Sequence, residues 1–94
     1  MDKMKGNKIE IKLPEEIAGG VYANNMVVGH TQEEFVMDFI YVAPPVGRVN
    51  ARVIVSPPHM KRILRALKEN IRKYEAEYGP IPEPPEISED VLIQ

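Results

Sequence analysis

The sequence has 94 residues, of which 44% are hydrophobic and 28% charged, and its formal net charge is −2. A chain of this size has room for one domain, which buries about 60 to 70% of its unfolded surface without a metal ion or a disulfide. It has no cysteine, which excludes disulfides, thiolate metal sites and cysteine nucleophiles. No apolar run approaches the ~20 residues of a membrane-spanning helix, and the polar N-terminus lacks the apolar stretch of a secretory signal. We therefore expect a soluble, cytoplasmic protein with no membrane partner.

Four segments with strand-like composition come first in the chain. Residues 1–7 form a polar tail that we expect to be disordered. Lys8–Leu13 alternates charged and apolar residues, and this two-residue period is typical of a strand with one solvent-exposed face. Val21–Val28, Phe35–Val42 and Arg48–Val55 follow, separated by short turns. Because these turns are too short for parallel crossovers, the last three segments predict an antiparallel meander.

The turn around Pro45 predicts which residues of the last two strands lie opposite one another. Folding back at this residue pairs Asp38 with Arg52 on one face and leaves the other face wholly apolar. The same reasoning around a turn centred on Thr31 places Asn24 beside Asp38. The best-defined polar cluster that the sequence predicts therefore contains Asn24, Asp38 and Arg52. A shift of the strand register by one residue would break this arrangement.

One long helix follows the strands, and both of its ends are marked in the sequence. Ser56 is a favourable N-cap, Pro57 suits the first helical position, and Gly79 followed by proline ends the helix. Between these ends, large side chains recur at alternating steps of four and three residues. We call this set the seam: Met60, Leu64, Leu67, Ile71, Tyr74 and Tyr78. Residues 80–94 form an acidic, proline-rich tail that we expect to be extended.

Together these elements predict a single α+β domain over residues 8–79. It has an antiparallel sheet of three to four strands followed by one long C-terminal helix, and we expect the seam to lie on the apolar face of the sheet. The helix, ~30 Å long, exceeds what such a sheet needs, and the second sheet face is half apolar. These two surfaces predict a homodimer or a higher homo-oligomer. The predicted interaction residues are Asn24, Asp38, Arg52, Ile71, Tyr74 and Tyr78.

Charge is segregated along the C-terminal part of the chain. Residues 59–73 have a local net charge of +5, and residues 75–94 have a local net charge of −6. Within the helix, Lys61, Arg65, Lys68 and Arg72 form a row that we call the basic stripe. The stripe is a possible phosphate-tracking face for nucleic acid or another polyanion, although it is more often the solvated side of an amphipathic helix. A sequence pI near 5.7 and the absence of Trp argue against nucleic-acid binding.

No pattern of side chains indicates catalysis. A carboxylate beside a guanidinium, as predicted for Asp38 and Arg52, is suited to binding a polar ligand or to proton chemistry. More often, the two groups bond only each other and form a structural ion pair. His30 and His59 lie far apart without a paired acid, so we expect neither a metal nor a catalytic role. Phosphate-binding glycine motifs are absent, and no cofactor is expected.

Several short runs resemble a known family. They are Tyr22-Ala23-Asn24, Glu34-Phe35, Asp38-Phe39, the run from Arg52 through Pro57, and the run from Asn70 through Glu75. This combination resembles a bacterial and archaeal family of roughly 100-residue proteins catalogued only as a domain of unknown function, and the resemblance implies no activity. The order of a meander and a long helix also resembles, in topology, the export chaperone SecB, a homo-oligomer that binds unfolded chains.

The sequence therefore favours a non-catalytic, homo-oligomeric protein-interaction module, chaperone-like or an accessory subunit. Nucleic-acid binding through the basic stripe is the alternative, and an enzyme that uses Asp38 and Arg52 is a more distant third.

Overall fold

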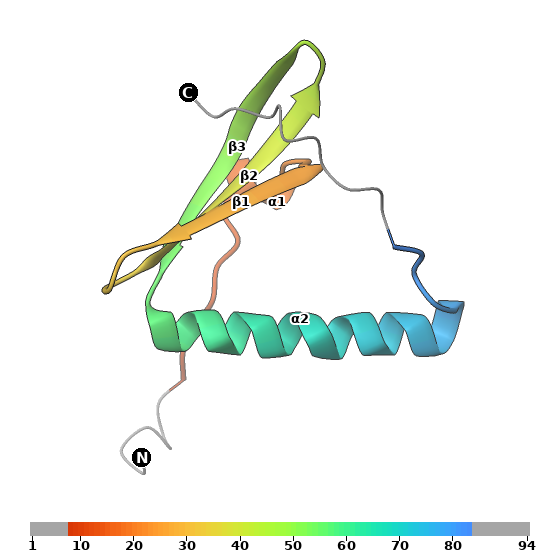
Figure 1. The fold of residues 1–94 in the computed structure, drawn as a ribbon. Helices are drawn as coiled ribbons and strands as arrows, with labels where there is room; N and C mark the ends of the chain where they lie inside the picture. Colours follow the sequence, from red (N-terminus) through yellow and green to blue (C-terminus); the bar gives the residue numbers. More distant parts are fainter. Residues whose placement is uncertain (1–7, 84–94) are drawn as a thin grey trace. The chain divides into compact units, whose positions relative to one another are not determined.

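A computed structural model describes residues 8–83 of the chain, and Figure 1 shows its elements. In chain order these are α1 (Glu15–Ala18), β1 (Asn25–His30), β2 (Phe35–Ala43), β3 (Val46–Val55) and α2 (Pro57–Tyr78). The chain divides between Ile54 and Val55 into two compact units, a sheet unit and a helix unit, and each is described by itself. The predictions for residues 1–7 and 84–94 lie outside the described residues.

The sheet unit contains three antiparallel strands in the order β1-β2-β3, which confirms the predicted α+β class and the meander (Figure 1). β2 is the central strand and is rich in β-branched and aromatic residues, which suit a pleated and shielded surface. Met37, Asp38 and Ile40 are its buried residues. Since neighbouring residues of a strand point to opposite faces, Met37 and Asp38 show that β2 is shielded on both faces.

The strand predicted at Lys8–Leu13 is not formed, so the prediction of a fourth strand was wrong. Residues 8–14 have no regular structure, and Ile9, Ile11 and Leu13 are exposed. Alternation gives a segment a strand-like face, but a strand also needs a neighbour that accepts and donates its backbone hydrogen bonds. Among residues 8–83, no strand pairs with this segment.

β1 begins later than predicted, and its register with β2 differs from the prediction. His30 lies opposite Phe35 and Met26 opposite Phe39, so the connecting loop is Thr31–Glu34. Thr31 holds this loop, because its Oγ1 accepts hydrogen bonds from the backbone N–H groups of Glu33 and Glu34 at 3.2 and 3.3 Å. A turn centred on Thr31 would pair Asn24 with Asp38, whereas Val27 is the residue of β1 that lies opposite Asp38.

This change of register moves the apolar residues of β1 to the other face of the sheet. Opposite residues of antiparallel strands share a face, so Met26 and Val28 lie on the face of Phe39 and Met37. Val27 lies on the face of Asp38 instead. The shift is by an odd number of residues, and because the side-chain period of a strand is two, every side chain of β1 changes face.

The helix α2 has the bounds that the sequence predicts. Ser56 is the N-cap, and its Oγ accepts a hydrogen bond from the backbone N–H of His59 at 3.4 Å. Pro57 occupies the first helical position, where a missing N–H costs nothing. The backbone N–H of Gly79 donates to the carbonyl of Glu75 at 2.9 Å, and its φ of 95° with ψ of 168° ends the helix.

The backbone at Gly79 gives a direct test of this helix end. Gly79→Ala should lower the free energy of unfolding by about 1 to 3 kcal/mol, because this combination of φ and ψ is essentially restricted to glycine. The measurement is urea unfolding followed by circular dichroism at one fixed protein concentration.

Gly19→Ala is the matched control for that change. Gly19 has ordinary helical angles, φ −76° and ψ −18°, and a Cβ at either glycine would meet no atom within 4 Å. Gly19→Ala should be neutral or stabilise the protein by up to about 1 kcal/mol. Equal effects of the two substitutions would show that the backbone angle at Gly79 does not determine the end of α2.

Candidate functional site

Asp38 of β2 and Arg52 of β3 form the ion pair that the sequence predicts. Arg52 donates from Nε to Oδ1 at 2.7 Å and from a terminal nitrogen to Oδ2 at 2.8 Å, so both carboxylate oxygens are used. The two partners differ in exposure: the side chain of Asp38 is 9% exposed and that of Arg52 is 59% exposed. The carboxylate is therefore the buried partner, and the guanidinium reaches it from the solvent side.

The guanidinium controls the ionisation of Asp38. The hydrogen bonds from Arg52 lower the pKa of Asp38 below its ordinary value of 3.8, and the positive charge of Arg52 lowers it further against the opposing effect of burial. The same contact raises the pKa of Arg52. A carboxylate held ionised with both oxygens occupied is a poor proton acceptor. This geometry favours the structural interpretation of the pair over proton chemistry.

Asn24 is not part of this cluster, and the prediction that placed it beside Asp38 was wrong. Its side chain instead bonds the backbone of Val42: Nδ2 donates to the Val42 carbonyl at 3.1 Å, and Oδ1 accepts from the Val42 N–H at 2.9 Å. Its own backbone N–H donates to the carbonyl of Ile40 at 3.0 Å. The amide of Asn24 thus acts like one more peptide group and ties the segment before β1 to the end of β2.

Asn50 makes a related hydrogen bond to the backbone that the sequence did not predict. Its Nδ2 donates to the backbone carbonyl of Tyr22 at 2.8 Å, and the rings of Tyr22 and Tyr41 meet edge to face with centroids 5.7 Å apart. These contacts join residues 28 and 19 positions apart in the chain, so they follow from the tertiary fold and no local pattern signals them.

The seam lies along one side of α2 and is exposed over most of its length. Leu64, Leu67, Ile71, Tyr74 and Tyr78 are each 50 to 67% exposed. Tyr74 and Tyr78 lie against each other at its C-terminal end, with ring centroids 4.9 Å apart and ring planes tilted by 50°. Within the described part of the helix unit, α2 is the one regular element. Between residues 55 and 83, no second helix or strand covers the seam.

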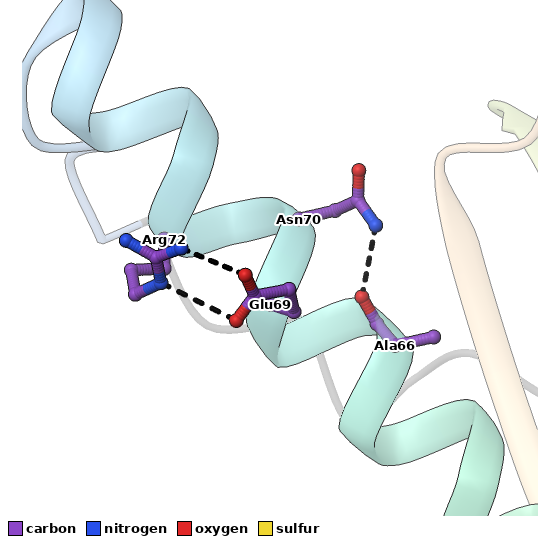
Figure 2. Close-up of polar contacts among 4 residues, drawn as sticks. All are labelled: Ala66, Glu69, Asn70 and Arg72. Carbon is purple, nitrogen blue, oxygen red and sulfur yellow. Dashed lines mark hydrogen bonds and ion pairs between the residues drawn. The ribbon is translucent and has the colours of Figure 1, made fainter.

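The basic stripe is partly neutralised within the helix. Arg72 donates to both carboxylate oxygens of Glu69, at 3.3 and 2.7 Å, as Figure 2 shows. Both side chains of this pair are largely exposed, and the pair lowers the pKa of Glu69. Among residues 8–83, no carboxylate pairs with Lys61, Arg65 or Lys68. The spacing of Glu69 and Arg72 is one that faces side chains together on a helix, so this pair was visible in the sequence.

Two further polar contacts organise the second half of α2. Asn70 donates from Nδ2 to the backbone carbonyl of Ala66 at 3.0 Å, so its side chain is bound to its own helix (Figure 2). Glu75 accepts a hydrogen bond from the backbone N–H of Ile81 at 2.9 Å, which ties the chain after Gly79 back to the helix. The sequence interpretation missed this role of Glu75.

The structure adds two observations about sites of other kinds. Between residues 8 and 83, His, Asp and Glu side chains do not gather into a group able to hold a metal ion. In the same range, no helix is both long and apolar enough to cross a membrane.

The unequal burial of Asp38 and Arg52 predicts how the pair responds to mutation and pH. In the wild type the folded pKa of Asp38 is depressed, so the pair stabilises the fold above pH ~4 and the stabilisation is lost as the pH falls through the folded pKa. Arg52→Gln leaves a shielded carboxylate without its cation. Unfolding midpoints in urea should fall clearly at pH 7, and the gap from the wild type should close as the pH is lowered to 3.

Arg72→Gln is the matched control, since it removes a guanidinium from a carboxylate that is 49% exposed. Water replaces the lost partner of Glu69, so its unfolding midpoint at pH 7 should stay close to that of the wild type. If Arg52→Gln were as mild as Arg72→Gln, Asp38 would be hydrated in solution and the pair would not fix the sheet.

Comparison with known proteins adds a family assignment. A family model with the description "Protein of unknown function (DUF3467)" matches residues 1–83. No curated protein and no solved structure matches the chain.

Proposed function

Since the chain belongs to the DUF3467 family, whose description names no activity, we propose from its structure that it is a non-catalytic, homo-oligomeric protein-interaction module. The observation that carries this proposal is the imbalance between buried and exposed apolar side chains. Among the described residues, Met37 and Ile40 are the buried hydrophobic residues, whereas twenty large hydrophobic side chains are exposed.

The sheet unit supports the proposal because apolar side chains on the strands beside β2 are exposed. Met26 and Val28 of β1, on the face of Met37, are 46 and 49% exposed, and Val53 of β3 is 41% exposed. A sheet with an apolar face gains stability when that face is buried against another element. Exposed apolar patches of this kind in soluble proteins commonly mark interaction surfaces.

The helix unit supports it independently. A lone helix in water derives little stability from its own hydrogen bonds, and most helical stability in proteins comes from packing of the apolar face. The seam continues over about three heptads, which is the length at which helices associate through such a face. A second copy of the chain supplies a matching seam without requiring another protein.

Two forms of this function are compatible with such surfaces. A chaperone-like module uses exposed apolar faces to hold unfolded chains, and an accessory subunit uses them to join a larger assembly. In both forms the polar pair Asp38–Arg52 stabilises the sheet and takes no part in chemistry, because both carboxylate oxygens are occupied.

Nucleic-acid binding through the basic stripe is the second candidate. The observation in its favour is that Lys61, Arg65 and Lys68 have no ion-pair partner within residues 8–83. Against it, Arg72 is paired with Glu69, and the exposed tyrosines Tyr74 and Tyr78 contact each other with tilted rings and form no flat platform for bases.

The first prediction of the proposal is self-association. Light scattering at about 100 μM, which populates any dimer of micromolar affinity, should give a mass above the 10.7 kDa of one chain. Ile71→Asp should shift this mass to that of the monomer or unfold the protein, since a charge buried without a partner is strongly unfavourable.

Ala66→Asp is the matched control for that experiment. It introduces the same charge near the middle of α2, outside the seam, and should leave the mass of the assembly unchanged. A pure monomer for the wild type at this concentration would refute self-association, and equal effects of the two aspartates would show that the seam is not the surface involved.

A further prediction separates the two candidate functions. Truncation after Ile81 removes the acids Glu83, Glu86, Glu89 and Asp90, which changes the net charge from −2 to +2, and keeps the hydrogen bond between Ile81 and Glu75. If the stripe is only the solvated face of α2, the truncated protein should not bind RNA or DNA at low salt. Fluorescence anisotropy with a labelled oligonucleotide measures this.

Binding that appears after truncation would favour the nucleic-acid function. It should then weaken with a slope of log affinity against log salt of roughly −3, for about three phosphate contacts. Replacing Lys61 and Lys68 by Gln in the truncated chain is the control, because it should abolish binding through the stripe and leave any binding through other surfaces unchanged.

A further inference from the structure

The residues of the seam form two columns along α2. Leu64, Ile71 and Tyr78 are seven residues apart from one another, and so are Met60, Leu67 and Tyr74. When two such helices pack side by side in opposite directions, each layer of the interface joins one residue from each column. When they run in the same direction, each layer joins a residue to its own copy.

In the opposite-direction arrangement, one register pairs every residue of the seam. Leu67 meets Ile71 of the second copy, Leu64 meets its Tyr74, and Met60 meets its Tyr78. Each pair occurs twice about the two-fold axis, so no seam residue is left without a partner. A closed two-fold interface of this kind is self-complementary and ends with the dimer.

The sizes of the side chains favour this direction. The two tyrosines lie together at the C-terminal end of the seam. A same-direction pair would bring four tyrosines together at one end and leave the aliphatic residues Met60 and Leu64 together at the other. The opposite direction places a tyrosine against an aliphatic residue at both ends, so the interface has even thickness and packs at uniform density.

The charges of α2 favour the same direction. Its first half contains Lys61, Arg62 and Arg65 without an acid, whereas its last turn contains Glu75 and Glu77 without a base. A same-direction pair sets the basic halves side by side. The opposite direction sets each basic half beside an acidic end and aligns the helix dipoles favourably.

One specific ion pair follows from this register. Lys61 follows Met60 and Glu75 follows Tyr74, so both flank the same column of the seam on the same side. In the opposite-direction register, Lys61 of one copy therefore lies beside Glu75 of the other. Glu75 is half-buried, and one of its oxygens accepts the N–H of Ile81, which leaves the second oxygen for the lysine. Lys68 lies near its own copy at the two-fold axis, where its long stem lets the two ammonium groups separate.

We infer that the partner of the seam is the seam of a second copy of this chain, packed in the opposite direction with Leu67 against Ile71, Leu64 against Tyr74 and Met60 against Tyr78. This inference rests on the proposed function, because it specifies which face forms the homo-oligomer and in what register.

The absence of cysteine from the sequence allows a direct test by cross-linking. Met60→Cys and Tyr78→Cys are prepared separately in the full chain, and each is checked for folding by circular dichroism and for mass by light scattering. Each variant alone, and an equal mixture after subunit exchange, is then treated with a short bis-maleimide. The mixture should give several-fold more cross-linked dimer than either variant alone, because position 60 meets position 78 only across two different copies.

The other outcomes overturn the inference in distinguishable ways. Cross-linking of Met60→Cys to itself means that the helices run in the same direction. A dimer by light scattering without cross-linking in the mixture means that another face, such as the sheet, forms the dimer, and the proposed function survives without this register. A monomer at all concentrations overturns both.

A charge exchange tests the register with surface variants that do not touch the seam. Lys61→Glu and Glu75→Lys should each weaken the homodimer about tenfold, through two exposed pairs turned repulsive. Mixing the two should restore affinity, because both pairs are then attractive in the mixed dimer. Arg62→Glu carries the same change of charge on the far side of the helix and should leave the affinity unchanged; equal weakening by Arg62→Glu, or no recovery in the mixture, overturns the register.

Discussion

Covering apolar side chains is the constraint on which the stability of this protein depends. Among the described residues, Met37 and Ile40 are the buried hydrophobic residues, whereas most residues of the seam and several apolar residues of β1 and β3 are exposed. The hydrophobic effect is the main favourable term in folding, and it is small for a chain of this length even when burial is complete. Burial of the apolar face of either unit against another surface would therefore add to its stability.

Polar contacts set the geometry of the sheet unit within this constraint. The carboxylate of Asp38 is shielded and takes both hydrogen bonds from Arg52, so β2 and β3 are held in one relative position. Asn24 and Asn50 bind backbone groups and fix the segment that leads into β1. The pair of Asp38 and Arg52 is specific because a shielded carboxylate is costly to leave unpaired. They hold the apolar residues of β1 and β2 on a common face.

The two sides of α2 in the helix unit differ in the kind of side chain that they carry. One side of α2 carries the seam, which ends with the adjacent rings of Tyr74 and Tyr78. The rest of its surface is charged, and there Arg72 and Glu69 neutralise each other. The charges add little to the stability of the helix, because exposed pairs are screened by water. Their arrangement along the axis is uneven, with basic residues in the first half of α2 and Glu75 and Glu77 in its last turn.

Local signals in the sequence determined the elements that depend on neighbouring residues. Ser56, Pro57 and Gly79 define the ends of α2 through capping and backbone angles, and these act within one turn of the helix. The composition of β2 and the short turn at Pro44–Pro45 give the hairpin that pairs Asp38 with Arg52. The family resemblance, carried by short runs within the strands and the helix, is confirmed as well.

Only the tertiary structure decided the features that depend on partners distant in the chain. The alternation of Lys8–Leu13 is a property of the segment itself, but a strand requires a neighbouring edge, and no strand in the described part of the chain pairs with this segment. The register of β1 depends on where the loop closes, and the hydrogen bonds of Thr31 move that point so that Asn24 meets Val42 rather than Asp38. The periodicity of apolar residues in the sequence indicates which side chains of a strand or helix share a face. Which face meets which partner is set by the hydrogen bonds and packing that form when the strands come together.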